Sequence, residues 1–348
     1  MIVVDGSFGE GGGQILRTAI GISAALGKPV KIVNIRARRR NPGLQPQHLT
    51  AVKALAQIAS ARVDGAYIGS TQLVFEPRGL RGGEYIFDVG TAGSVTLVLQ
   101  ALAPVLPFLD RETVIELRGG TDVPWSPPID YIKYVFIPIV KRLGLNIGVD
   151  VVRRGHYPRG GGIVRVYAHP AKKLVSVELV ERGSVIRVGG KSHCVKLPKH
   201  VAERQANAAK EFLASLSIPV DIELEFYEPG KDPHLGPGSG IVLYAETEKS
   251  ILGADSLGEK GKPAEVVGRE AAEKLLEEIG SGAALDSHMG DMMVSLACLA
   301  KGVTKYTTSK LTLHTETVLK IAQDIAGCNY TVSDYGKAKL IEIRGIGL

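Results

Sequence analysis

The apolar positions of the chain recur in a fixed order, in which a helix-periodic stretch ends at glycine or a similar break and a β-rich run follows. This order occurs four times, over residues 20–33, 139–149, 212–224 and 321–332. Glycine ends helices because it adopts the left-handed conformation readily, and the β-branched residues after it favour strands. We therefore predict an α+β fold of repeated units, each a small sheet with helices on one face.

The third copy of this pattern differs in what surrounds it. A polar, alanine-rich helix is predicted over 198–216, and the most turn-rich stretch of the chain, 229–240, comes after its strand. Such a density of proline and glycine marks a loop. One more strand and a charged helix over about 263–279 complete a small βαββα unit.

A chain of 348 residues is long enough to carry this unit as an insert in a larger domain. We predict an inserted small domain over 183–277 and a large repeat-built domain over 1–182 plus 278–348. The formal net charge is +6, which favours an anionic partner.

Membrane proteins and zinc proteins are disfavoured. No run approaches 18 consecutive apolar residues, and Met1 to Asp5 lacks the basic flank of a signal peptide. No pair among the eight histidines has the i, i+4 zinc spacing. We expect a cytoplasmic protein with no membrane partner, and we expect its three widely spaced cysteines to be reduced, mostly buried thiols: Cys194, Cys298 and Cys328.

Two segments near the N-terminus indicate an anion site. Residues 6–14 form a glycine-rich turn that runs into a helix, and residues 36–48 form an arginine cluster held by proline and glycine. Free amides at a helix start and guanidinium forks both suit phosphate, so the ligand is a nucleotide or a nucleic-acid end. Glu10, beside the glycines, is a natural Mg²⁺ partner.

Other interpretations of these two segments stay open. The glycines alone suit an ordinary tight turn, and an arginine run is often a solvated face. A Walker A loop is excluded because no Gly-Lys-Ser/Thr follows. The dinucleotide fingerprint is disfavoured because its spacing differs and no strand leads cleanly into the turn.

His314 is the histidine of most interest. Small polar residues surround it at the start of an apolar helix that is predicted to begin near Thr315. A neutral imidazole at such a position suits nucleophilic attack on phosphorus, although a lone histidine at such a place is usually a structural residue. The segment 286–291 precedes another apolar helix, where helix capping is the simpler interpretation.

Taken together, the motifs resemble the RNA 3′-terminal phosphate cyclase family, in family order and over essentially the whole chain. The resemblance is to its archaeal-type catalytic branch. The segments that carry it are Phe8 to Arg17, Ile35 to Ala37, Pro42 to Leu44, Gln47 to Leu49, Thr91 to Ser94, Pro158 to Gly162, Gly236 to Gly240 and Leu311 to Thr315.

The resemblance implies an ATP-dependent ligase-type enzyme that converts an RNA 3′-phosphate to a 2′,3′-cyclic phosphodiester. A histidine takes adenylate from ATP, the RNA 3′-phosphate accepts it as RNA(3′)pp(5′)A, and the vicinal 2′-OH closes the ring and expels AMP. Splitting one displacement into easier ones is covalent catalysis. A divalent metal, Mg²⁺ or Mn²⁺, and cationic side chains offset the phosphate charge.

The resemblance also assigns roles by position. His314 falls on the nucleophile, and Glu10 and Arg17 complete the catalytic group, with Glu10 at the metal. ATP-binding positions besides His314 are Gln100, Pro127, His288, Asp291 and Met292. Positions for RNA and phosphate are Arg36, Arg39, Gln47 and His48.

Two of these ATP-binding positions depart from the family. His288 stands where relatives often carry Tyr, and a histidine ring can still stack on a base. Met292 stands where relatives often carry Gln, and methionine cannot make the hydrogen bonds of the Gln amide. The resemblance therefore implies the chemistry and leaves open how His288 and Met292 change the ATP affinity.

The implied fold has three units, each a four-stranded sheet with two helices as in enolpyruvyl transferases, and a smaller domain inserted before the third unit. The resemblance does not identify the physiological RNA, and it does not decide between a monomer and a homodimer.

Three other functions compete with this interpretation. A non-catalytic relative that binds RNA in ribosome assembly lacks the nucleophile, and the retained His314, Glu10 and Arg17 oppose it. An enolpyruvyl-type transferase needs no adenylated histidine. A simple RNA-binding module is disfavoured because only 5% of residues are aromatic, too few for stacking along a strand.

Overall fold

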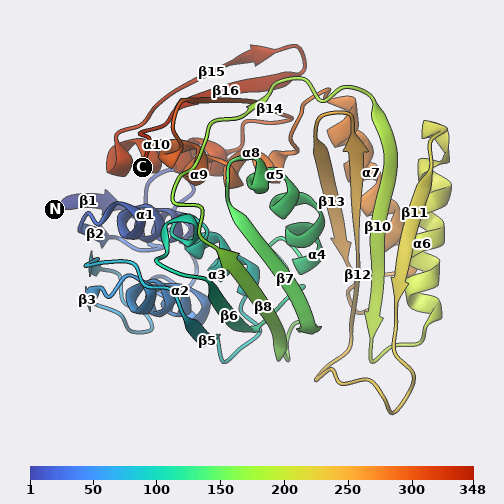
Figure 1. Cartoon of the computed structure of the whole chain (residues 1–348). Coiled ribbons are helices and arrows are strands. Elements are labelled where there is room, and N and C mark those ends of the chain that lie inside the picture. The colour runs from blue at the N-terminus through green and yellow to red at the C-terminus, as the bar shows by residue number, and fades with distance from the viewer.

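The computed structural model describes residues 1–348 and contains four separate four-stranded sheets. Three of them share one strand order, in which the first strand of the unit pairs with the second, the second with the fourth and the fourth with the third. In each, the first pair is parallel and the other pairs are antiparallel. The predicted α+β fold with three repeated units of a sheet and two helices is confirmed (Figure 1).

The units follow one another along the chain with the same order of elements. The first unit contains β1 (Ile2–Asp5), α1 (Gly13–Leu26), β2 (Val30–Val33), α2 (Pro46–Ile58), β3 (Arg62–Asp64) and β4 (Leu73–Glu76). The second contains β5 (Glu84–Asp88), α3 (Val95–Leu102), η1 (Leu106–Phe108), β6 (Thr113–Gly119), α4 (Ile129–Tyr131), η2 (Ile132–Phe136), α5 (Ile137–Arg142), β7 (Asn146–Arg153) and β8 (Gly162–His169). The third contains β9 (Glu178–Leu179), α8 (Ser287–Met292), α9 (Val294–Leu299), β14 (Val303–Thr308), α10 (Leu313–Ala326), β15 (Asn329–Tyr335) and β16 (Ala338–Arg344).

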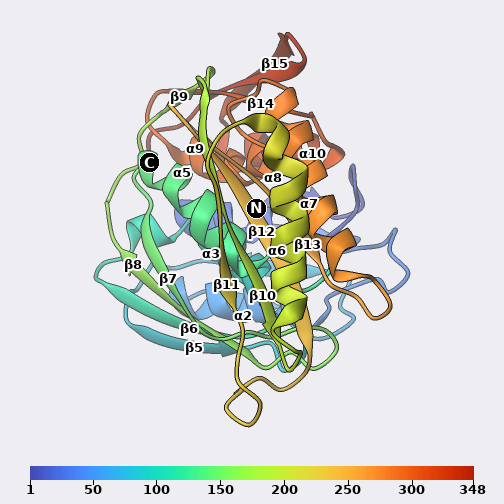
Figure 2. The ribbon, with the colours of Figure 1, turned by 90° about the vertical axis from the view of Figure 1, so that its right-hand side faces the viewer.

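The fourth sheet, with strand order β11-β10-β12-β13, lies with its two helices on the right in Figure 1, away from both chain termini. Figure 2 shows α6 and α7 side by side against one face of this sheet. Its fourteen buried apolar residues form a cluster separate from the main core, so this part packs around a core of its own. Its elements are β10 (Val185–Val195), α6 (His200–Leu213), η3 (Ala214–Leu216), β11 (Val220–Glu225), β12 (Gly238–Thr247), β13 (Ile251–Leu257) and α7 (Ala264–Gly280).

The structure differs from the expected insert in two respects. The order of elements in this unit is βαβββα instead of the predicted βαββα. The additional strand is formed by residues 251–257, which pair antiparallel with β12 and which the sequence pattern did not reveal. The insertion also falls inside the third unit, since β9 precedes it and pairs in parallel with β14. A strand of two residues carries too little periodicity to be recognised from sequence. The boundaries 183–277 stay a prediction.

Three further local expectations are corrected. The strand β1 does lead into the glycine-rich turn, and α10 begins two residues before Thr315, because Thr312 caps it. Cys298 and Cys328 form a disulfide, so the expectation of three reduced thiols is wrong for these two. Their separation of thirty residues gave no local signal, because pairing requires only that α9 and the segment after α10 meet in space.

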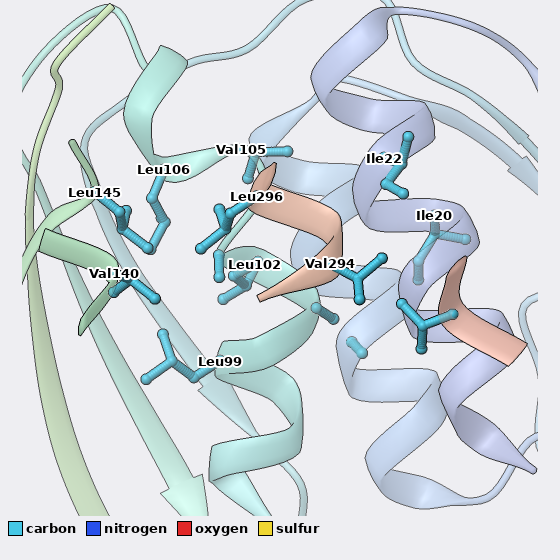
Figure 3. Close-up of a cluster of buried hydrophobic side chains, with 14 of the residues drawn as sticks. Ile20, Ile22, Leu99, Leu102, Val105, Leu106, Val140, Leu145, Val294 and Leu296 are labelled. Carbon is cyan, nitrogen blue, oxygen red and sulfur yellow. The ribbon is translucent and has the colours of Figure 1, made fainter. Parts of the chain in front are cut away.

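The helices of the three units face one another in the main core, which contains 69 buried apolar residues. Side chains from α1, α3 and α9 point toward a common centre, among them Ile20, Leu102 and Leu296 (Figure 3). Because the three units bury their helices together, the helix starts of different units come close at one side of this core. No helix of the structure is long and apolar enough to span a membrane.

Candidate active site

Two helix starts from different repeat units meet at the predicted nucleophile. Helix α1 has Gly12 as its N-cap, so no side chain occupies the amides of its first turn. Helix α10 packs against α1 and is capped by Thr312, whose hydroxyl accepts from the Thr315 amide at 3.1 Å. His314 is the second residue of α10. It therefore stands at the positive end of the α10 dipole, and its ring contacts the side chain of Gln14 in the first turn of α1.

The His314 ring is held in one orientation by Gln14. The two ends of the Gln14 amide differ in their partners, because Nε2 donates to Asp291 Oδ2 at 3.1 Å and Oε1 lies 2.5 Å from His314 Nδ1. An amide oxygen only accepts, so Nδ1 carries the proton. In the neutral imidazole, Nε2 then keeps its lone pair. Half of the His314 side chain is exposed, which leaves that atom open to a ligand.

Glu10 connects His314 to the arginine cluster. One of its carboxylate oxygens lies 3.5 Å from His314 Nδ1, and the other is paired with Arg39. The Glu10 amide is directed to Thr317 Oγ1 of α10 at 3.4 Å, which ties the glycine-rich loop to that helix. Glu10 therefore lies between an imidazole and a guanidinium.

Arg17 and Asp291 line a small cavity behind His314. Gln100 and Met292 line the same cavity, so four of the predicted ATP or catalytic positions come together there. Arg17 makes no hydrogen bond or ion pair with the protein, and burial lowers its pKa to about 10 against the opposing effect of Asp291. Its guanidinium is available to an anion.

The protonation states of these groups suit chemistry near neutral pH. Burial raises the pKa of Asp291 to about 6, while His288 and His314 act against that rise. Burial also lowers the pKa of His314 below its usual 6.5; Asp291 opposes this change, and Arg17 and Arg39 add to it. A neutral His314 is therefore favoured at physiological pH, as a nucleophile requires.

His48 lies directly beneath the start of α1. A Cβ added to Gly13 would lie 2.0 Å from His48 Nε2, so glycine is required there by close approach. His48 Nδ1 accepts from the Gln45 amide at 3.2 Å, completing a capping box at the start of α2. Burial, with Arg17 and Arg36 nearby, lowers the pKa of His48 to about 3, so this residue stays neutral.

Other predicted positions are anchored at the start of α3. Gln47 Oε1 accepts from the Ser94 amide at 2.9 Å, and the Pro127 carbonyl accepts from Thr96 Oγ1 at 2.8 Å. The Ser94 and Thr96 hydroxyls lie 2.8 Å apart, so Gln47 and Pro127 are held by one small network. Neither residue makes a hydrogen bond with His314.

Arg36 and His288 are the two remaining positions. Arg36 turns back on its own loop, where Nη1 donates to the Gly43 carbonyl at 3.0 Å. His288 is exposed on α8, with its ring edge-on to Tyr131 and the two ring centroids 6.1 Å apart. The predicted capping role of Asp286 is borne out, because its carboxylate accepts from the amides of His288 and Met289.

Gln14 is the residue that sequence reasoning missed. It was part of the glycine-rich motif but received no role, although it makes the closest contact with His314. Its position three residues before Arg17, on the first turn of α1, puts both side chains on one face of the helix. That spacing was the signal available in the sequence.

Comparisons with known proteins agree over nearly the whole chain. The family model for RNA 3′-terminal phosphate cyclase matches residues 8–332. The RNA 3′-terminal phosphate cyclase of Hyperthermus butylicus is 57% identical over 326 residues, covering 93% of this chain and 91% of that protein. The protein of the same name from Caldivirga maquilingensis is 53% identical over 348 residues, covering 99% and 98%.

Among solved structures, the enolpyruvyl transferase NikO from Streptomyces tendae matches with 12% identity and a TM-score of 0.33. The match covers 99% of this chain and 48% of that chain, and the likeness is too weak to bear on function. The family model and the curated relatives are decisive. The chain belongs to the RNA 3′-terminal phosphate cyclase family.

Proposed function

We propose that this chain converts an RNA 3′-terminal phosphate to a 2′,3′-cyclic phosphodiester with ATP, through a covalent adenylate on His314. The chain is an enzyme of a family whose named relatives are RNA 3′-terminal phosphate cyclases. The observation that carries the mechanism is the tautomer of His314. Gln14 Oε1 and Glu10 both face Nδ1, which leaves the Nε2 lone pair free.

In the first step, His314 Nε2 attacks the α-phosphorus of ATP. The bond from that phosphorus to the α,β-bridging oxygen breaks, and pyrophosphate leaves with the electron pair. The imidazole becomes cationic, and its Nδ1–H is already directed to Gln14 and Glu10, so that charge is stabilised where it forms. The unpaired guanidinium of Arg17 offsets the negative charge on the phosphoryl oxygens.

In the second step, an oxygen of the RNA 3′-phosphate attacks the adenylate phosphorus and the bond to Nε2 breaks. The products are RNA(3′)pp(5′)A and a neutral His314. The vicinal 2′-OH then attacks the RNA 3′-phosphorus, loses its proton and expels AMP. Arg36, Arg39, Gln47 and His48 are proposed to hold the RNA phosphate, since Arg39 and His48 border the glycine-rich start of α1 and the other two belong to the same arginine-containing segment, 36–48.

Glu10 fits a divalent metal of the Mg²⁺ or Mn²⁺ type. Such ions are held by one or two carboxylates together with phosphate oxygens, and Glu10 supplies one carboxylate at the proposed phosphate site. Its ion pair with Arg39 has to open for the metal to bind. A bound metal would neutralise phosphate charge, and the residues of this chain would orient the reacting groups.

ATP is proposed to lie between the cavity behind His314 and α8. Gln100 and Asp291 offer polar contacts, and Met292 offers an apolar one. His288, exposed on α8, and Pro127 are the proposed walls for adenine. A homodimer stays a prediction. The ribosome-assembly alternative is disfavoured because the retained His314 is oriented for attack rather than bonded through both ring nitrogens.

The test is labelling with α-³²P-ATP and Mg²⁺ or Mn²⁺, followed by a denaturing gel. We expect label on the wild type that is lost in acid and survives alkali, and none on His314→Ala. His169→Ala, which changes an exposed histidine on β8, is the matched control and should label fully. Gln14→Leu should label about tenfold more slowly, because one charge-assisted hydrogen bond is lost. Equal labelling of His314→Ala would contradict the proposed nucleophile.

A further inference from the structure

A cleft with a volume of about 1010 Å³ lies between the large domain and the β10–α7 unit. On one side it is lined by residues 122–125 and 156–159, and on the other by parts of α6, β12 and the segment that joins β13 to α7. None of the proposed catalytic or ATP-binding residues lines it. The cleft is therefore a feature that the proposed chemistry does not use.

Two sequence motifs without a role in the proposed chemistry meet at this cleft. They are Pro158 to Gly162, in the β7–β8 loop, and Gly236 to Gly240, at the start of β12. A Cβ added to Gly238 would lie 2.0 Å from His156 Cγ, so a larger residue there would push the two walls apart. Both glycine motifs therefore serve to bring the walls of the cleft together.

The walls present two aromatic side chains to solvent. Trp125 is 98% exposed and Tyr157 is 71% exposed, although the chain has only one tryptophan and few aromatic residues. Trp125 also has a φ of +62°, a left-handed conformation that a side chain of this size rarely adopts. A strained backbone that holds a large aromatic ring in solvent is typical of a binding site.

The charge of the walls favours an anion. Arg159 and Lys260 are exposed and make no ion pair, and Glu259 is the one exposed acid among the lining residues. Two further cations in the cleft, Arg204 and Lys262, are already paired with glutamates beside it. Unpaired cations next to aromatic platforms are the combination that binds single-stranded nucleic acid.

Hydrogen bonds, the first of them accepted by the Gln47 side chain, connect the cleft to the proposed RNA-phosphate site. Gln47 accepts from the Ser94 amide, and Ser94 forms a bridge with Gly120. The next residue, Thr121, donates its amide to the Gly155 carbonyl at 2.8 Å, immediately before the cleft residue His156. Strand-like contacts therefore lead from the proposed phosphate site to the cleft wall.

We propose that this cleft binds the single-stranded RNA segment that precedes the reacting 3′ end. Bases stack on Trp125 and Tyr157, and backbone phosphates pair with Arg159 and Lys260. This inference rests on the proposed function for its choice of RNA. It adds that RNA affinity depends on several nucleotides in a cleft separate from the catalytic residues.

The experiment compares the affinity of the whole protein for two 3′-phosphorylated RNAs, a dinucleotide and a single strand of about twelve nucleotides. We expect Trp125→Ala and Tyr157→Ser each to weaken binding of the longer RNA about 5- to 100-fold, from the loss of one stacked base. Binding of the dinucleotide should change less than about twofold, because it does not reach the cleft. Tyr335→Ala, an aromatic residue on β15 outside the cleft, is the matched control and should change neither affinity.

Charge-removing variants supply a second measurement. Arg159→Gln and Lys260→Gln should each lower the salt slope of long-RNA binding by about 0.7, the value for one phosphate contact on a single strand. Unchanged long-RNA affinity in both aromatic variants, with unchanged salt slopes, would overturn the cleft as an RNA site.

The adenylate-labelling assay separates this proposal from the proposed function. The aromatic variants should label like the wild type, because the cleft does not contact His314. A wild type that binds the longer RNA through the cleft but takes no label would keep this inference and contradict the proposed chemistry. Lost labelling in the aromatic variants would instead contradict the separation of the two sites.

Discussion

Two arginines of this protein, the buried Arg154 and the partly buried Arg17, have opposite surroundings. Arg154 lies between the large domain and the β10–α7 unit and donates to three carboxylates, those of Asp122, Asp130 and Glu225. Arg17 lies behind His314 and has no hydrogen-bond partner in the protein. Against the effect of burial, the carboxylates raise the pKa of Arg154, whereas burial lowers the pKa of Arg17 to about 10.

This difference separates a structural charge from the one that we propose to be functional. Burying a charge costs free energy that partners must offset, and Arg154 has its partners within the fold. Arg17 lacks such partners although it is partly buried, and we propose that an anion in the cavity compensates its charge. The sequence shows two arginines among forty-two lysines and arginines, and only their surroundings distinguish them.

The largest expected effect on stability is at Arg154. Arg154→Met leaves two buried carboxylates and the partly buried Glu225 without their shared cation, so we expect the free energy of unfolding to fall by about 3–5 kcal/mol. Denaturant unfolding followed by circular dichroism measures this change. Arg165→Met, which removes an exposed arginine from β8, is the control and should cost less than about 1 kcal/mol. Equal losses in the two variants would show that the buried cluster is not specially stabilising.

The matching substitution at Arg17 should affect catalysis instead. Arg17→Met should lower the rate of His314 adenylylation about 10²–10³-fold, as expected when one preorganised charge at a reacting group is removed. The free energy of unfolding should stay within about 1 kcal/mol of the wild type or rise, because no protein partner is left unpaired. Arg62→Met, an exposed arginine on β3, should leave both quantities unchanged. A large stability loss at Arg17 would remove the contrast with Arg154.

The smallest expected effect is at Asp291, whose contribution to the free energy of unfolding should change with pH. Its pKa rises from the usual 3.8 to about 6 on folding, so the folded state binds the proton more tightly than the unfolded state. The contribution of Asp291 to stability is therefore fully present below about pH 4 and is lost as the pH rises through about 6. We expect Asp291→Asn to raise the free energy of unfolding at pH 7.5 by about 1–3 kcal/mol, at 1.36 kcal/mol per pKa unit.

Urea unfolding at pH 4 and at pH 7.5 checks this expectation. The gain from Asp291→Asn should largely disappear at pH 4, where the wild-type carboxyl is already neutral. Asp64→Asn, on the exposed end of β3, is the control and should show no such gain. A destabilised Asp291→Asn at pH 7.5 would mean that the charged carboxylate is needed by the fold rather than by the site.

Much of the fold was predictable because its signals are local. Glycine stops at Gly27 and Gly327 end α1 and α10, both in the left-handed conformation, and strands follow as expected. The two strands that were not predicted lack such local signals. The short strand β9 has no periodicity of its own and exists because β14 pairs with it. The strand β13 likewise becomes recognisable only beside β12.

The sequence by itself determined the repeated α+β units, the glycine-rich turn at the start of α1 and the presence of His314 at a helix start. These properties depend on residues close together in the chain, where caps, glycine stops and motif spacing act. Only the tertiary structure decided that Gln14 reaches His314, 300 residues away, and that Arg154 is paired while Arg17 is not. It also joined Cys298 to Cys328 and closed the Trp125 cleft. Contacts between distant segments follow from how the units bury their apolar faces against one another, and no local pattern specifies which polar groups that burial brings together.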